Sequence, residues 1–193
     1  MLASALLLAS GCSGGGGNPG PTSSAGGLGL TASATPSIPP RPKDLAASGL
    51  AACDVLTPAQ RATFKIDRFS LGTGERADKE PYCHYIVNPI GSTLRYSFSV
   101  APVSNASIEY WFGGVTATVK LIDVSGYPAA RVSSVSGAGR PGNQCGINVA
   151  IANGKTLGVE GQLVEAPFTE DQMCDKTVEV AKAALATLIE RNK

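Results

Sequence analysis

Apolar and polar residues alternate along several short segments of the chain, and this alternation predicts strands. In residues 94–100, apolar residues take every second position, and arginine and serines take the positions between them. Other runs of aromatic and β-branched residues end at turn residues and also predict strands. The predicted strands cover residues 66–74 (with a turn), 82–87, 94–100, 117–124, 131–135, 146–152 and 156–163. The Asn-Gly pair between the last two predicts a tight hairpin turn.

Two capping motifs predict where helices begin. In residues 57–64, a threonine N-cap, a proline at the first helical position and a glutamine three residues after the cap form a capping box. Thr169 and Gln172 repeat this spacing and predict a second, long helix. Apolar residues recur in it at helical spacing from Cys174 to Leu188, so one stripe of this helix should be buried.

These elements predict an α+β domain. Short turns join most of the strands, which favours a curved antiparallel sheet. We expect the short helix near the start of the domain and the long closing helix to pack on one face of that sheet. A further short helix is expected within residues 104–112, and residues 137–143 are expected to form a loop.

The first 12 residues have the pattern of an export signal. Residues 2–9 are apolar or small, and small residues follow as far as Cys12. The last four positions resemble a bacterial lipobox, in which the leader is cleaved before a cysteine that then carries acyl chains such as palmitate. We expect a signal peptide at 1–11 and a lipid anchor on Cys12. The alternatives are an ordinary secretory signal or a buried apolar N-terminus with an incidental thiol. No Lys or Arg precedes the apolar run, so we expect the natural leader to start upstream.

Composition separates a tether from a folded domain. Residues 13–43 are mainly Gly, Pro, Ser, Thr and Ala and carry no charge before Arg41, so they should not bury enough apolar surface to fold. We therefore expect the lipidated cysteine and a flexible linker at 12–44. Residues 45–193 should form one domain on the extracytoplasmic face of the cell membrane. The 16 basic and 15 acidic residues form no basic run, which argues against a nucleic-acid partner.

The five cysteines indicate disulfide bonds. With Cys12 lipidated, an even number remains, as expected in an oxidising compartment. Three pairings are open. We favour the pairing of sequence neighbours, Cys53 with Cys83 and Cys145 with Cys174, which closes two loops of about 30 residues. The wide spacing of these cysteines and the single histidine do not fit a zinc site, so no metal is expected.

The sequence contains no evident catalytic constellation. Residues 137–142 match G-x-G-x-x-G, but a strand is expected after them where a dinucleotide site needs a helix, so no cofactor is expected. Residues 45–193 contain no G-x-S-x-G elbow for a nucleophilic serine, and the carboxylates show no paired catalytic spacing. We therefore predict no catalytic residues. His84, the only histidine, is the one candidate general base.

The segment Tyr110, Trp111 and Phe112 holds the only tryptophan and is followed by two glycines. Aromatic residues beside a glycine pair are able to line a ligand groove or anchor an interface, although packing in the core is the alternative. These three residues are the candidate binding residues.

A set of motifs resembles a known protein family. Cys53 opens the run C-D-V-L-T-P-A, Cys83 opens Cys-x-Tyr, and residues 126–130 read Gly-Tyr-Pro-Ala-Ala. Cys145 heads a predicted strand, and Cys174 lies in the last predicted helix. With the lipobox and the linker, this arrangement resembles an uncharacterised domain family of actinobacterial, including mycobacterial, lipoproteins with four cysteines. The resemblance covers nearly the whole chain and implies an envelope location, an α+β fold and disulfides, but no activity.

Two functions from different classes remain as hypotheses. The first is a non-enzymatic lipoprotein of the cell envelope, tethered to the membrane, that binds an envelope protein or a small ligand. The second is an extracytoplasmic hydrolase that acts on wall or lipid substrates with His84 as its base. A cleft in which His84 reaches both a hydroxyl and a carboxylate would favour the enzyme. A structural wall-associated protein without a ligand is a weaker third hypothesis.

Overall fold

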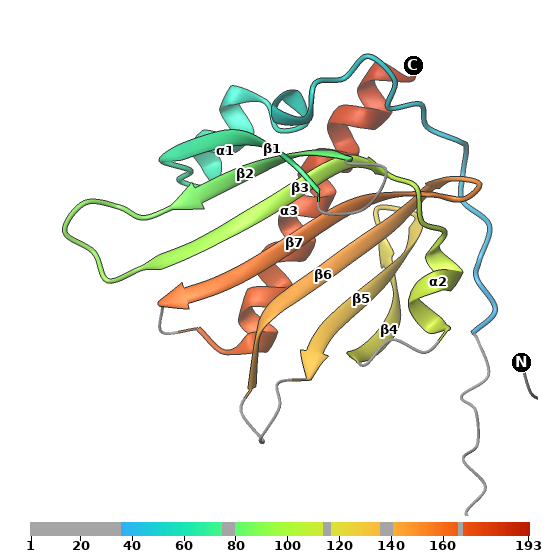
Figure 1. The fold of residues 1–193 in the computed structure, drawn as a ribbon. Coiled ribbons are helices and arrows are strands. Elements are labelled where there is room, and N and C mark those ends of the chain that lie inside the picture. The colour runs from blue at the N-terminus through green and yellow to red at the C-terminus, as the bar shows by residue number, and fades with distance from the viewer. Residues whose placement is uncertain (1–35, 75–79, 114–116, 136–140, 166–167) are drawn as a thin grey trace, which may run out of the picture. The chain divides into compact units, whose positions relative to one another are not determined.

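The fold is known from a computed structural model (Figure 1), which describes residues 36–74, 80–113, 117–135, 141–165 and 168–193. The predicted signal peptide, Cys12 and most of the predicted tether lie outside these ranges, as does most of the G-x-G-x-x-G segment. Only the folded domain is therefore described below.

The described residues form seven strands, three α-helices and one short 3-10 helix. In chain order they are η1 (Ala52–Asp54), α1 (Pro58–Thr63), β1 (Arg68–Thr73), β2 (Pro81–Val87), β3 (Arg95–Ser104), α2 (Ile108–Phe112), β4 (Ala117–Val124), β5 (Tyr127–Val135), β6 (Pro141–Ala152), β7 (Lys155–Glu165) and α3 (Glu170–Arg191).

All seven strands belong to one open antiparallel sheet with the order β1-β2-β3-β7-β6-β5-β4. Strand β7 lies between β3 and β6, so the last strand of the chain joins its two halves (Figure 1). With the long helix α3 and the short helix α1, this arrangement confirms the predicted α+β fold.

The prediction of a loop over 137–143 is wrong for its last three residues. Strand β6 begins at Pro141, which pairs with Val135 of β5. Proline has no N–H to donate to a neighbouring strand, but it is tolerated as the first residue of a strand. The glycine and proline pattern therefore hid the true start of β6.

Helix α3 covers one face of the sheet, against β6 and β7 (Figure 1). The helix begins at a complete capping box, in which the Gln172 N–H donates to Thr169 Oγ1 and the Thr169 N–H donates to Gln172 Oε1. Helix α1 has the same box and lies beside α3, because Gln60 Nε2 donates to the Ala183 carbonyl over 2.9 Å. Both predicted helix starts are confirmed.

The core lies between this face of the sheet and the helices. Its largest fully buried side chains come from the strands, from the segment before α1 and from α3: Tyr85, Phe98, Leu56, Ile147, Ile151, Leu157, Met173, Leu185 and Leu188. On β3 the buried positions include those that the alternation had assigned to the core face. Removing this apolar surface from water is the main source of the domain's stability.

Two disulfides fasten the helical segments to the sheet. Cys53 of η1 is bonded to Cys83 of β2, and Cys145 of β6 is bonded to Cys174 of α3. These are the pairs of sequence neighbours that the cysteine spacing favoured. Each bond links an element of the helical layer to a strand.

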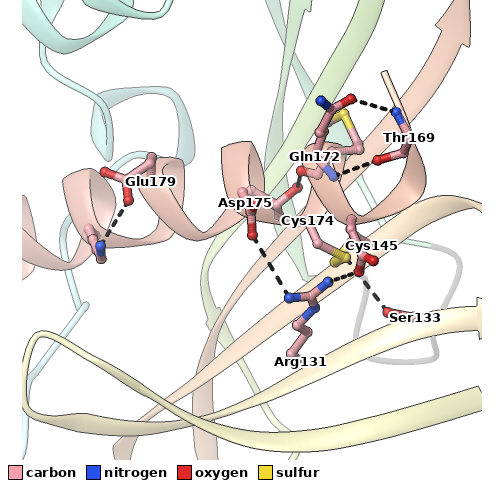
Figure 2. Close-up of polar contacts among 12 residues, drawn as sticks. Arg131, Ser133, Cys145, Thr169, Gln172, Cys174, Asp175 and Glu179 are labelled. Carbon is pink, nitrogen blue, oxygen red and sulfur yellow. Dashed lines mark hydrogen bonds and ion pairs between the residues drawn. A yellow bond between two sulfur atoms is a disulfide. The ribbon is translucent and has the colours of Figure 1, made fainter. Parts of the chain in front are cut away.

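Beside the second disulfide, a basic residue of the sheet reaches the first turns of α3 (Figure 2). Arg131 of β5 pairs with Asp171 over 2.6 Å and with Asp175 over 3.9 Å. The two aspartates are exposed, so the ion pairs contribute modestly to stability and mainly orient the start of the helix.

The last residues of the predicted tether already contact the domain. Arg41 bonds Asp44 over 2.5 Å and Asn153, in the β6–β7 turn, over 2.6 Å. The ammonium group of Lys43 donates to the Asn192 carbonyl over 2.7 Å. The contacts of the folded domain thus begin a few residues before position 45.

Candidate functional site

The sheet face opposite α3 has small side chains at its centre. Ala101 of β3 lies opposite Gly158 of β7, and Gly158 lies opposite Asn148 of β6. Side chains alternate between the two faces of a strand, and the core residues of these strands face α3. The Asn148 side chain and the position of Gly158 therefore belong to the opposite face. Three neighbouring strands therefore present an alanine, a glycine and a single amide at this place.

The next row of residues across the same face also carries mainly small side chains. Ser99 of β3 lies opposite Glu160 of β7, and Glu160 lies opposite Gly146 of β6. The glycine and the serine leave space around the one long side chain of this row. The two rows together make the floor of a depression.

This depression is a hollow of about 740 Å³, within the range of about 300–1,000 Å³ that ligand pockets usually occupy. Its polar lining includes Glu80, Tyr82, Ser99, Trp111, Asn148 and Glu160. No lysine or arginine belongs to the lining within the described part of the chain.

Asn148 is the most deeply placed polar residue of the hollow, with 7% of its surface exposed. Its amide has no hydrogen-bond partner among the residues that the structure describes. A Cβ atom on Gly146 would lie 3.6 Å from Asn148 Nδ2, and one on Gly158 would lie 3.6 Å from Asn148 Oδ1. The two glycines thus leave the amide open to the hollow, where water or a ligand is able to bond to it.

Trp111 supplies a second unpartnered group. Helix α2 is held on this face of the sheet by a small apolar cluster around Ile108, Ala130 and Ala150. Trp111 packs against this cluster and also lines the hollow. Its indole Nε1 is buried and has no hydrogen-bond partner within the described ranges.

The structure separates the three aromatic candidates. Trp111 reaches the hollow, whereas Phe112 packs against the cluster under α2. Tyr110 is 54% exposed and touches the edge of the Trp111 indole, with ring centroids 5.3 Å apart. Among the three, Trp111 is therefore the residue positioned to contact a ligand in the hollow.

His84 lies at the border of the same face. Its Nδ1 is 3.2 Å from Ser99 Oγ, and Glu160 lies opposite Ser99 on the far side. The order across the sheet is therefore histidine, serine, carboxylate. A Ser-His-Asp site needs the imidazole between the other two groups, so this row does not have the order of a triad.

Glu160 is electrostatically linked to His84. Although the Glu160 side chain is exposed, nearby protein atoms reduce the hydration of its carboxyl group, which raises its pKa, and His84 partly opposes this by lowering it. Among the described lining residues, no lysine or arginine accompanies this carboxyl group. When ionised, the carboxylate is a hydrogen-bond acceptor.

Sequence reasoning missed most of this floor. The sequence pattern places Ser99 on the polar face of its strand, and it distinguishes neither Glu160 nor Asn148 from other polar residues. The available signal was the recurrence of small or polar residues at every second position of β3, β6 and β7, because such positions cannot all belong to a packed layer.

In the described ranges, no group of three or more His, Cys, Asp or Glu side chains is arranged to hold a metal ion. Among the helices in those ranges, none has the length and apolar character needed to cross a membrane.

Comparison with known protein families identifies the family of the chain. Residues 7–187 match the model of a family described as "Protein of unknown function (DUF3558)". No curated protein and no solved structure matches the chain.

Proposed function

Because the chain belongs to the DUF3558 family, whose description assigns no function, we propose from its own residues that it is a lipid-anchored domain that binds a small polar ligand outside the membrane. The ligand site is the hollow on the sheet face opposite α3. The anchor is Cys12, exposed by cleavage after residue 11.

One observation carries the ligand-binding part of this proposal. Two polar groups of the hollow make no hydrogen bond to the residues that the structure describes: the buried Trp111 indole N–H and the Asn148 amide, which lies open to the hollow. Buried polar groups are nearly always bonded, so an unpartnered polar group beside a pocket is a candidate to bond a ligand there. The glycines beside Asn148 keep access to its amide open.

The anchoring part rests on the sequence. The apolar run, the small residues before Cys12 and the glycine-rich segment after it fit a lipoprotein signal and tether. The resemblance to actinobacterial lipoproteins supports the same location. The two disulfides of the domain suit an oxidising compartment outside the cytoplasm.

Two measurements test the proposal. The intact mass of the membrane-extracted protein should match a chain starting at Cys12 plus acyl groups, and it should gain four hydrogens when the two disulfides are reduced. An unlipidated mass would overturn the anchor.

For the ligand, the test is NMR of the full chain with a chemically mixed library of small molecules. The indole N–H signal of the only tryptophan should shift when a compound of the library binds. If no compound of the library shifts this indole signal, the hollow is not a ligand site.

A hydrolase is the second candidate, favoured by the 3.2 Å contact between His84 and Ser99 beside the hollow. In this mechanism Ser99 would be the nucleophile and His84 the general base. Ser99 lies between His84 and Glu160, and the paired position on the other side of His84 holds Ser70, so neither neighbouring strand position offers a carboxylate to orient the imidazole. Ester and glycoside hydrolysis that disappears in both His84→Ala and Ser99→Ala would support the enzyme. Absence of hydrolysis by the native protein across such a panel would exclude it.

A further inference from the structure

The charges of the hollow restrict the ligand. Glu80 and Glu160 are its charged lining residues in the described part of the chain, and both are acidic. The Glu80 carboxylate is already engaged, because it accepts a hydrogen bond from the backbone N–H of Asn105. A negatively charged ligand would meet carboxylates and no lysine or arginine among the described lining residues, which disfavours phosphates, sulfates and carboxylic acids.

The hydrogen-bonding groups restrict it further. The Trp111 indole is only a donor and an ionised Glu160 is only an acceptor, whereas Asn148 offers both an N–H group and a carbonyl oxygen. A hydroxyl group both donates and accepts and therefore suits all three. These groups come from α2, β7 and β6, so a single ligand needs several hydroxyl groups to reach them together.

Aromatic rings stand on two sides of this polar floor. Tyr82 of β2 lies against the backbone of Gly72, since a Cβ there would be 2.5 Å from the Tyr82 ring. Trp111 lies on α2, which packs over β5 and β6. The strands that carry Tyr82 and Asn148, β2 and β6, are three inter-strand spacings apart, roughly 14 Å at the usual distance between neighbouring strands. This width exceeds one pyranose ring.

We infer that the hollow binds a neutral saccharide of at least two rings, with its hydroxyl groups on Asn148, Glu160 and the Trp111 indole N–H, and its C–H faces against the aromatic rings. This inference rests on the proposed function, because it assumes that the hollow is the ligand site. A saccharide combines hydroxyl groups that donate and accept with apolar C–H faces and no net charge. The lining offers partners for each of these features.

The test is an NMR titration of the isotope-labelled full chain in detergent. The probes are maltose, cellobiose, mannobiose and di-N-acetylchitobiose, compared with spermidine as a cation and with citrate and glucose phosphate as anions. The readouts are the Trp111 indole N–H and the Asn148 side-chain NH₂ signals. We expect at least one neutral disaccharide to shift both signals in a saturable way, and the anions to shift neither.

Three variants locate the binding. Asn148→Leu removes the amide, and we expect it to weaken saccharide binding at least tenfold. Trp111→Phe keeps an aromatic ring but removes the indole N–H, and it should weaken binding severalfold even if Asn148→Leu fails to fold. Glu179→Gln lies on α3, on the other side of the sheet, and should bind like the native chain.

The outcomes separate this inference from the proposed function. If spermidine or an anion shifts the two signals and no disaccharide does, the saccharide inference is wrong while the hollow remains a ligand site. If no probe of any class shifts them, both the inference and the proposed site fail. Saccharide binding that is unchanged in Trp111→Phe and Asn148→Leu would place the sugar elsewhere and also overturn the inference.

Discussion

Thr177 of α3 packs directly on the backbone of Gly161 in β7. A Cβ atom on Gly161 would lie 2.1 Å from Thr177 Oγ1 and 2.6 Å from Met173 Cε. Thr177 is fully buried, and its hydroxyl donates to the Met173 carbonyl over 2.8 Å. The helix therefore approaches the sheet at a point where only a residue without a side chain fits.

Gly161→Ala should destabilise the domain by about 1–3 kcal/mol, because the added methyl group must displace a buried threonine and part of α3. The measurement is the free energy of unfolding from urea denaturation. Gly158→Ala, three residues earlier on the same strand, is the matched control. Its Cβ would meet neighbours at 3.6 Å or more, so its stability should stay within about 1 kcal/mol of the native value. Equal effects of the two substitutions would show that the helix is not held this closely at Gly161.

Removing the Cys145–Cys174 disulfide should loosen the attachment of α3. Replacing both cysteines by alanine should lower the free energy of unfolding by roughly 3–4 kcal/mol, the loop-closure value for bridged residues 29 positions apart. The pair Cys53→Ala and Cys83→Ala opens a loop of similar length, with a separation of 30, and serves for comparison. Hydrogen exchange of α3 amides should increase more in the first double variant than in the second. The reverse order would contradict this role for the Cys145–Cys174 bond.

Glu160 should titrate above the ordinary carboxyl pKa of 4.5, because its carboxyl group has lost part of its hydration. In the pH range between the ordinary and the raised pKa, the folded state binds more protons than the unfolded state, so this residue makes stability fall as pH rises. Glu160→Gln should remove that component of the pH dependence. Carbon NMR of the Glu160 side chain gives the pKa directly.

His84 provides an internal check on the same titration. Because His84 lowers the pKa of Glu160, His84→Ala should raise it further. An unchanged or lower pKa of Glu160 in this variant would show that the two side chains are not electrostatically linked.

Tyr85 should resist ionisation in alkali. Burial raises its pKa to about 12, although Leu56 and Arg61 act in the opposite direction, and its hydroxyl donates to the Cys53 carbonyl over 3.2 Å. Between pH 10 and about 12, an unfolded chain has lost this proton while the folded chain keeps it, so stability falls as pH rises. Tyr85→Phe should be less stable than the native chain at neutral pH by about 1 kcal/mol. The difference between the two should shrink as the pH approaches 11, and a constant difference would contradict the raised pKa.

The elements of this fold were largely predictable, because alternation, capping boxes and Asn-Gly are local signals. Errors occurred where proline interrupts a strand: β3 continues through Pro102 to Ser104, beyond the predicted end at Val100. A register shift between Ala101 and Ser104 accommodates this residue. Such an irregularity depends on the neighbouring strand, so the local pattern of residues does not reveal it.

The hollow was not predictable for a different reason. It exists because β7 lies between β3 and β6, which brings Ser99, Glu160 and Gly146 into one row. In the sequence these residues are separated by long segments, and the order of strands in an antiparallel sheet does not follow from their patterns. Trp111 could be suspected from its type, but its place in the lining of the hollow depends on where α2 packs.

The two ends of the described domain meet at Asn192. Its side-chain amide accepts a hydrogen bond from the Ala46 N–H over 2.9 Å and donates one to the Ala46 carbonyl over 3.0 Å, and Lys43 bonds its backbone. A tether joined after residue 193 would therefore leave the domain at almost the same place as one joined before residue 43. The architecture permits circular permutation, in which the old ends are linked and new ends are opened in an exposed turn.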